Sequence, residues 1–207
     1  ERRIGFDNSH RQDARVPRIF FTHDNYLRDY TGAGESRRDF RGKRVVLLVR
    51  NPQDTAVSQY FQWKYRMKPN KKDINEYPLA DLAPFEFVMS EAGLPKVIEF
   101  MNLWAREAPR IRDFMIVRYE DLRARPEETL KALLEFLATP ASAAQIADAI
   151  EFASYDNMKR MEQQRVFWLS GGRLVPKDRD NPNSYKVRRG KVAGYRAEGY
   201  TRFQLRV

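Results

Sequence analysis

A charged residue and a hydroxyl flank the start of a predicted helix in the stretch VVLLVRNPQDTAVSQYF, residues 45–61. An apolar run ends at Arg50, and Ser58 lies about two turns into the helix that follows. Asn51 is a good N-cap, the proline after it fits the first helical turn, and Asp54 occupies the position of a capping-box acid. Helix side chains lean toward the N-terminus, so Arg50 and Ser58 can converge where backbone N–H groups attract anions. This arrangement would suit a phosphate, and the alternative is that Arg50 pairs with a carboxylate while Ser58 faces solvent.

A second candidate anion site is the basic stretch KVRRGKVAGYR, residues 186–196. It places Arg188, Arg189 and Lys191 around Gly190. A glycine lets successive backbone N–H groups turn toward one anion, and the flanking cations add positive charge. The alternative interpretation is a solvated basic tail that binds no ligand.

Strands that alternate with helices must position these residues. The predicted strands are RIFFTH, RVVLLVR and FMIVRYE, at residues 18–23, 44–50 and 114–120. The second is apolar without alternation, which is typical of a strand covered on both faces in a parallel sheet. The predicted helices span residues 52–67, 84–106 with a break near 93–95, 126–137 and 141–152. The pattern predicts an α/β fold, with irregular segments at residues 68–81 and 163–207.

Taken together, these segments resemble the cytosolic-type sulfotransferases, which transfer a sulfuryl group from 3′-phosphoadenosine 5′-phosphosulfate (PAPS). VRNPQDTAVSQYF is similar to the family's 3′-phosphate-binding strand and helix. VRRGKVAGY is similar to its Arg-Lys-Gly-x-x-Gly-x-Trp segment, with Arg189 for lysine and Tyr195 for tryptophan. FTHDNYL is similar to its Lys-Thr-His strand end, with Phe21 in place of the lysine. VRYEDLRARPEETLKALLEFL and EFASYDNMKRME also fall in the family's order and spacing.

The resemblance implies a nucleotide site built from both anion-binding candidates. Arg50 and Ser58 would hold the 3′-phosphate of the nucleotide, and Arg188, Arg189 and Gly190 would close on it. PAPS would be the co-substrate, adenosine 3′,5′-bisphosphate (PAP) the product, and no metal would be required.

The resemblance also implies adenine contacts and a catalytic base. Tyr119 and Tyr155 would contact the adenine, and Ser154 would lie in the same loop. Ala153 stands where the family often has threonine, so one polar contact would be absent. His23 would be the general base that takes the proton of a small-molecule hydroxyl or amine acceptor.

The implied fold is a P-loop-NTPase-like three-layer sandwich, with a parallel sheet flanked by helices, in a single domain over residues 1–207. The family begins with a strand, a Lys-Ser-Gly-Thr-Thr type loop and a helix that bind the 5′-phosphosulfate. No equivalent is found here, because TGAGES at residues 31–36 has no lysine in place and follows the histidine strand. We therefore expect an N-terminally incomplete sulfotransferase domain, with acceptor-binding loops at residues 68–81 and 163–185.

Composition limits the classes of function. The chain has 207 residues, a net charge of +10 and an isoelectric point of about 9.9, which favours an anionic partner. It has no cysteine, which excludes disulfides and thiolate catalysis, and only two histidines, which disfavours a histidine-rich metal site. The sequence contains neither an apolar run of roughly 18 residues nor a signal peptide, so the predicted location is the cytoplasm. A homo-oligomer is compatible with the sequence.

Three alternative functions can be compared with the sequence. A P-loop nucleotide kinase would need a Gly-x-x-x-x-Gly-Lys-Ser/Thr loop and magnesium ligands, and the sequence has neither. A nucleic-acid-binding module fits the charge, but no zinc finger, RRM signature or basic helix with heptads is present, so no specific nucleic-acid partner is expected. A non-catalytic descendant of the same fold would bind nucleotide without turnover.

Overall fold

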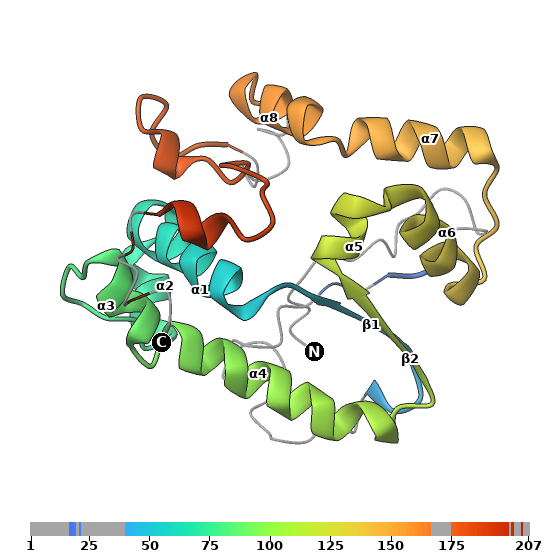
Figure 1. The fold of residues 1–207 in the computed structure, drawn as a ribbon, viewed down its shortest axis with the longest axis horizontal. Coiled ribbons are helices and arrows are strands. Elements are labelled where there is room, and N and C mark those ends of the chain that lie inside the picture. The colour runs from blue at the N-terminus through green and yellow to red at the C-terminus, as the bar shows by residue number, and fades with distance from the viewer. Residues whose placement is uncertain are drawn as a thin grey trace. The chain divides into compact units, whose positions relative to one another are not determined.

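The computed structural model describes residues 17–19, 21, 40–166, 175–198, 200 and 204 (Figure 1). The chain divides into two compact units. Unit 1 comprises residues 1–49 and 99–143, and unit 2 comprises residues 50–98 and 144–207. One boundary between them falls within helix α4, Leu94–Glu107.

Unit 1 contains a parallel pair of strands, β1 (Arg44–Val49) and β2 (Asp113–Arg118), drawn side by side in Figure 1. Arg44 lies opposite Asp113, and the register continues to the last residue of each strand. The predicted parallel pairing of the two apolar strands is therefore confirmed. Their core side packs against the second half of α4, in a cluster of Val45, Leu47, Phe100, Trp104, Ile111 and Phe114.

Within the described part of unit 1 one face of β1 is exposed, so the prediction that β1 is covered on both faces is not confirmed there. Leu48 is 56% exposed and Val46 is 36% exposed, and on β2 Ile116 is 54% exposed. Successive side chains of a strand point to opposite faces, so Val46 and Leu48 lie on the face away from Val45. The apolar run thus has one packed face and one exposed face.

Two helices follow β2 in unit 1. These are α5 (Tyr119–Ala124) and α6 (Pro126–Phe136). The predicted helix at 126–137 is confirmed, and its proline and two glutamates occupy the first turn, where they suit the helix dipole. Helix α5 was not predicted, because it has only six residues and begins directly after the strand. Tyr119 therefore opens a helix and does not end a strand.

Unit 2 is helical in its described part. Its elements are α1 (Pro52–Phe61), the π-helix η2 (Gln62–Arg66), α2 (Pro69–Ile74), α3 (Pro84–Met89), α7 (Ala143–Phe152), α8 (Tyr155–Gln163), and the 3₁₀ turns η4 (Pro182–Ser184) and η5 (Gly194–Ala197). A further 3₁₀ turn, η3 (Ala108–Arg110), belongs to unit 1. The helix predicted at 52–67 is confirmed as α1 continued by η2, whereas α2 and α8 were not predicted.

The predicted break near residue 93 separates α3 from α4. A Cβ atom on Gly93 would lie 2.3 Å from the backbone oxygens of Phe87 and Val88. Only glycine allows this close approach of two backbone segments. The break is therefore specified by a steric requirement at one residue.

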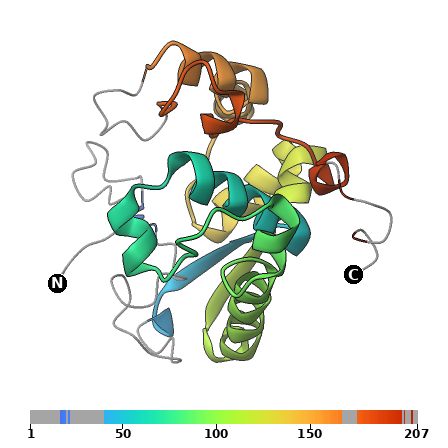
Figure 2. The ribbon, with the colours of Figure 1, turned by 90° about the vertical axis from the view of Figure 1, so that its left-hand side faces the viewer.

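An aromatic cluster forms the core of unit 2 beneath α1. Trp63 stacks on Phe87 at a centroid distance of 4.7 Å, and Tyr60 contacts both rings edge-on or tilted. Phe87 is fully buried, and the Trp63 indole N–H donates to the Pro78 carbonyl at 3.1 Å. Figures 1 and 2 both show the C-terminal segment that contains η5, coloured red, beside α1.

The third predicted strand, residues 18–23, falls mostly outside the described residues, which include only 18, 19 and 21 of it, without a strand assignment. The three-layer sandwich remains a prediction, because the described residues hold a two-stranded sheet. None of the described helices is long and apolar enough to cross a membrane.

Candidate functional site

The turn after β1 places Arg50 and the start of α1 as the sequence predicted. Asn51 is the N-cap of α1, and its side-chain oxygen accepts a hydrogen bond from the Asp54 backbone N–H at 3.2 Å. The Thr55 hydroxyl donates to the Asn51 carbonyl at 2.9 Å. These contacts satisfy polar groups at the helix start and hold the turn that presents Arg50.

Asp54 ties this turn to a segment far away in the sequence. Its carboxylate is buried and accepts the backbone N–H groups of Ala193 at 2.8 Å and Tyr195 at 2.9 Å. The Arg50 guanidinium lies 3.3 Å from the same carboxylate and donates to the Lys191 carbonyl at 2.9 Å. Asp54 therefore serves as more than a local cap, because it anchors the basic segment beside Arg50.

The structure contains elements of both interpretations of this turn. Arg50 has a carboxylate partner and Ser58 is exposed, as the alternative interpretation expected. Arg50 also meets the basic segment 186–196 across 141 residues of sequence, which the phosphate-site interpretation requires. The basic segment is thus docked on α1 and is not a solvated tail.

Arg188 and Arg189 share one acidic partner. The Glu198 carboxylate lies 2.8 Å from Arg188 and 3.3 Å from Arg189. The Arg188 guanidinium also lies over the Phe61 ring, 3.6 Å from its centroid, which is a cation–π contact. Burial and the nearby Glu198 charge raise the pKa of Tyr200 to about 12, so this phenol is neutral beside the ion pairs. Arg189 is the more exposed of the two arginines.

Gly190 and Tyr155 fit against each other. Gly190 has a φ angle of +59°, in the left-handed region that favours glycine. A Cβ atom there would lie 2.5 Å from a ring carbon of Tyr155. The Tyr155 hydroxyl donates to the Arg188 carbonyl at 3.0 Å. The predicted adenine residue and the predicted phosphate residue are therefore neighbours.

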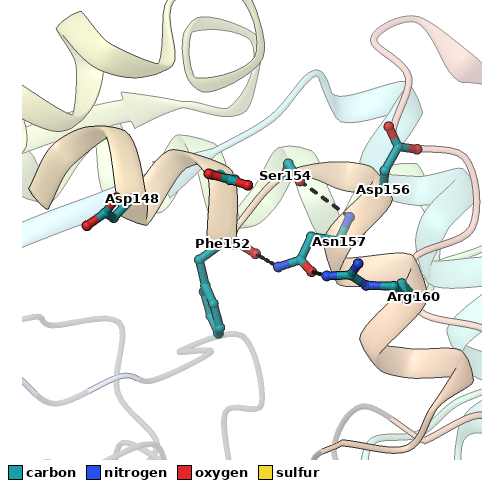
Figure 3. A pocket seen from close by; sticks show the side chains of 7 residues that line it. Asp148, Phe152, Ser154, Asp156, Asn157 and Arg160 are labelled. Atoms are coloured by element: carbon teal, nitrogen blue, oxygen red, sulfur yellow. Dashed lines mark hydrogen bonds between the residues drawn. The ribbon is translucent and has the colours of Figure 1, made fainter. Parts of the chain in front are cut away.

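Ser154 lies at the junction of α7 and α8, on the wall of an open cavity of about 490 Å³. Its hydroxyl is the N-cap of α8 and accepts the Asn157 backbone N–H at 3.3 Å. Figure 3 shows Asn157 between the Phe152 carbonyl and Arg160, which it contacts at 2.7 and 2.6 Å. The other lining side chains are the acids Asp148, Glu151 and Asp156. Their negative charge makes this cavity unsuited to a phosphate.

Two charged residues near the basic segment were missed from the sequence. Arg66 donates to the Tyr185 carbonyl at 3.0 Å and the Ser58 carbonyl at 3.4 Å. Burial lowers the pKa of Arg66, the charge of Glu162 raises it, and the charge of Arg188 lowers it. Glu162 itself is fully buried on α8. The serine N-cap of α8 was the signal that could have predicted this helix, whereas no local pattern marks Arg66.

Most of the predicted nucleotide-binding residues belong to unit 2. Unit 2 holds the candidates Arg50, Ser58, Ser154, Tyr155, Arg188, Arg189 and Gly190. Tyr119 belongs to unit 1, where it opens α5. His23 lies outside the described residues. In the described ranges, no group of three or more histidine, aspartate or glutamate side chains is arranged to hold a metal ion.

Comparison with known proteins identifies the family. Residues 37–203 match the sulfotransferase domain. The chain belongs to the sulfotransferase domain family. This sulfotransferase-family chain is 30% identical to Cytosolic sulfotransferase 15 of Arabidopsis thaliana over 152 residues, which cover 70% of this chain and 40% of that protein. It is 23% identical to Sulfotransferase 2A6 of Mus musculus over 155 residues, 74% of this chain and 50% of that protein.

The solved structure of mouse sulfotransferase SULT7A1 complexed with PAP has the same fold over the matched region. The TM-score is 0.56 at 20% identity, over 79% of this chain and 54% of that chain. The sulfotransferase-family chain spans about half the length of the relatives it matches. The α/β architecture and the family resemblance predicted from the sequence are thus confirmed.

Proposed function

We propose that this chain carries the nucleotide-binding residues of a PAPS-dependent sulfotransferase that acts on a hydroxyl or amine of a small molecule. The observation that carries the proposal is the docking of the basic segment 186–196 beside Arg50, through the Lys191 carbonyl and Asp54. Family membership supports it, and so does the PAP bound by the mouse relative. The Arabidopsis relatives are named cytosolic, and we propose the cytoplasm as the location of this chain too.

The proposed 3′-phosphate site comprises Arg50, Ser58, Arg188, Arg189 and Gly190. The arginines can donate paired N–H groups to phosphate oxygens, and the left-handed backbone at Gly190 turns N–H groups toward an anion. The charge of Arg66 acts on Arg188, and the buried Arg66 Nε has no hydrogen-bond partner among the described residues. These residues fit a doubly charged phosphate better than a neutral ligand.

The proposed adenine contacts are Tyr119, Tyr155 and Ser154. The Tyr155 ring lies against Gly190, so a base stacked beside it would bring the 3′-phosphate close to the glycine turn. Ser154 immediately precedes Tyr155 and could present its hydroxyl to a polar edge of the base. The adenine contact of Tyr119 is proposed from the family resemblance.

The proposed reaction is transfer of the sulfuryl group from PAPS to the acceptor. PAPS supplies the activated sulfuryl group, with PAP as the leaving group. The acceptor oxygen or nitrogen forms the new bond to sulfur, the bond from sulfur to the phosphate oxygen breaks, and His23 takes the acceptor proton. A histidine base suits this step because its pKa lies near neutrality, and such catalysis contributes roughly 10²–10⁴-fold.

The test of the nucleotide site is calorimetric titration of the chain with PAP and with 5′-AMP. We expect a preference for PAP of at least about tenfold, and we expect Arg50→Ala to remove it, because the guanidinium is the charge closest to the strand end. Arg112→Ala, which removes an 80% exposed arginine from unit 1, should keep the preference. Equal, weak binding of both nucleotides by the unsubstituted chain would contradict the proposal.

The test of His23 separates chemistry from binding. His23→Ala should reduce sulfuryl transfer by roughly 10²-fold or more and leave PAP affinity unchanged, because a general base acts on the acceptor proton. Transfer is measured with radiolabelled PAPS and a phenol acceptor, and PAP affinity by calorimetry. If the substitution lowers PAP affinity as much as it lowers the rate, His23 is a structural residue.

A further inference from the structure

Glu162 is a fully buried carboxylate on α8, and in the described part of unit 2 its hydrogen bonds come from backbone N–H groups. Its Oε1 accepts the Lys186 N–H at 2.7 Å and its Oε2 accepts the Val187 N–H at 2.8 Å. Both oxygens are therefore engaged by consecutive residues at the start of the basic segment. A buried carboxylate needs such donors, and charge-assisted hydrogen bonds of this length are strong.

Arg66 reinforces the same contact from the π-helix η2. Its guanidinium donates to the Tyr185 carbonyl, one residue before the two N–H groups held by Glu162. The charges of Arg66 and Glu162 also attract each other. The backbone of Tyr185, Lys186 and Val187 is therefore held from two sides.

Asp54 holds the other end of the segment in the same manner. It accepts the N–H groups of Ala193 and Tyr195, as described above. Between the two carboxylates lie Arg188, Arg189 and the glycine turn. Two backbone anchors fix the path of a short segment, so the directions in which its intervening side chains leave the backbone are fixed too.

We propose that Glu162 is a positioning residue of the nucleotide site: its two backbone hydrogen bonds place the basic segment so that Arg188 and Arg189 face the 3′-phosphate. The inference rests on the proposed function, because it assumes that these arginines bind that phosphate. In this proposal Glu162 does not contact the ligand. Its effect on binding is transmitted through the backbone of residues 186 and 187.

Glutamine at position 162 is the sharpest probe of this role. It has nearly the shape of glutamate, but its amide group offers one acceptor oxygen and one NH₂ donor. The oxygen can accept one of the two N–H groups, while the NH₂ would face the other N–H, donor against donor. Glu162→Gln should therefore release one end of the segment without leaving a cavity.

The experiment combines two measurements on Glu162→Gln and on the unsubstituted chain. Amide hydrogen exchange reports whether Lys186 and Val187 are protected, and calorimetry reports the affinity ratio of PAP to 5′-AMP. We expect loss of protection at the amide that faces the glutamine NH₂ and a reduction of the PAP preference by about tenfold, with 5′-AMP affinity little changed. A purely structural residue would lower stability without changing this ratio.

Two further variants serve as controls. Glu91→Gln removes the same charge from an exposed position in unit 2 and should leave both measurements unchanged. Arg189→Ala removes one proposed phosphate ligand. When Glu162→Gln is added to Arg189→Ala, it should reduce the PAP preference by a smaller factor than it does in the unsubstituted chain, because both changes act on the same contact.

The outcomes distinguish this inference from the proposed function. Unchanged protection in Glu162→Gln overturns the inference, and so does lost protection with an intact PAP preference. If the Lys186 or Val187 amide loses protection in Glu162→Gln but the unsubstituted chain shows no preference for PAP, the proposed function and the positioning role are both overturned. Glu162 would then hold the backbone without a role in nucleotide binding. If Glu162→Gln does not fold, amide hydrogen exchange of the unsubstituted chain tests the inference instead. PAP should raise the protection of the amides from Lys186 to Lys191, and the absence of an increase would overturn the inference.

Discussion

At the scale of single residues, the described site is dominated by side chains that bind backbone. Asp54 and Glu162 each accept two backbone N–H groups of the basic segment. Tyr155 donates to the Arg188 carbonyl within it, and Arg66 donates to the carbonyl of Tyr185, the residue just before it. Contacts of this kind fix where a segment lies, whatever side chains it carries. The basic segment is therefore held in place by residues outside it, and within it Gly190 has a left-handed backbone that lies against the Tyr155 ring.

Gly190→Ala should destabilise unit 2. The left-handed backbone conformation costs a residue with a Cβ about 1–2 kcal/mol, and the added methyl would also press on the Tyr155 ring. We expect the free energy of unfolding to fall by about 1 kcal/mol or more, as measured by urea unfolding followed through tryptophan fluorescence. PAP affinity should fall as well, since the displaced segment carries the proposed phosphate ligands.

Gly42→Ala is the matched control for this substitution. No heavy atom lies within 4 Å of the Cβ position at Gly42 outside its chain neighbours, and its φ angle is not in the left-handed region. Its effect on unfolding should be within about 0.5 kcal/mol. If the two alanine substitutions had equal effects, the constraint at Gly190 would be absent in solution.

At the scale of elements, the site depends on where two helices begin. Helix α1 starts at the Asn51 cap, which places Arg50 just before the first turn. Helix α8 starts at the Ser154 cap, which places Tyr155 in its first turn and Glu162 near its end. The distance along α8 between these two residues lets one helix contact the basic segment at both Arg188 and Lys186.

Ser154→Ala should destabilise α8, whereas Ser154→Asp should not. The serine hydroxyl caps the Asn157 N–H, an aspartate oxygen can replace it, and alanine cannot, at a cost of about 0.5–2 kcal/mol. Thermal unfolding of the two variants gives the comparison. If Ser154 also contacts adenine, Ser154→Asp should bind PAP more weakly despite normal stability. Equal stability of the two variants would contradict the capping role.

At the scale of the whole molecule, the net charge of +10 raises the question of nucleic-acid binding. At the candidate site, Arg50, Arg188 and Arg189 have acidic partners. The net charge already counts these acids and is a sum over the whole chain. Such an excess attracts any polyanion but does not select a sequence.

DNA binding by the chain should therefore be weak, independent of sequence and steeply dependent on salt. Binding that arises from counterion release loses affinity as a power of the salt concentration, and it should be negligible at about 0.2 M salt. Fluorescence anisotropy with two unrelated duplexes at several salt concentrations measures this. A preference of roughly 10³-fold for one sequence would instead favour the nucleic-acid-binding alternative.

Local patterns of residues were enough to predict the parts of this protein that depend on interactions between near neighbours in the chain. The two apolar runs predicted strands, and Asn51, Pro52 and the Pro-Glu-Glu start at residue 126 predicted where two helices begin. The motifs around Arg50 and Gly190 predicted the sulfotransferase family, which the comparison confirmed. These predictions succeed because caps, turns and strand periodicity involve residues only a few positions apart.

The contacts that join these parts became visible in the folded chain. Glu162 meets the basic segment across 24 and 25 residues of sequence, and Asp54 meets it across 139 and 141. In the sequence Asp54 resembled a local cap, and Glu162 resembled any acid on a polar helix face. The exposed face of β1 could not be predicted either, because an apolar run does not indicate which of its faces another element will cover. Contacts between distant residues form only when the chain has folded, so no short pattern of residues could have shown them.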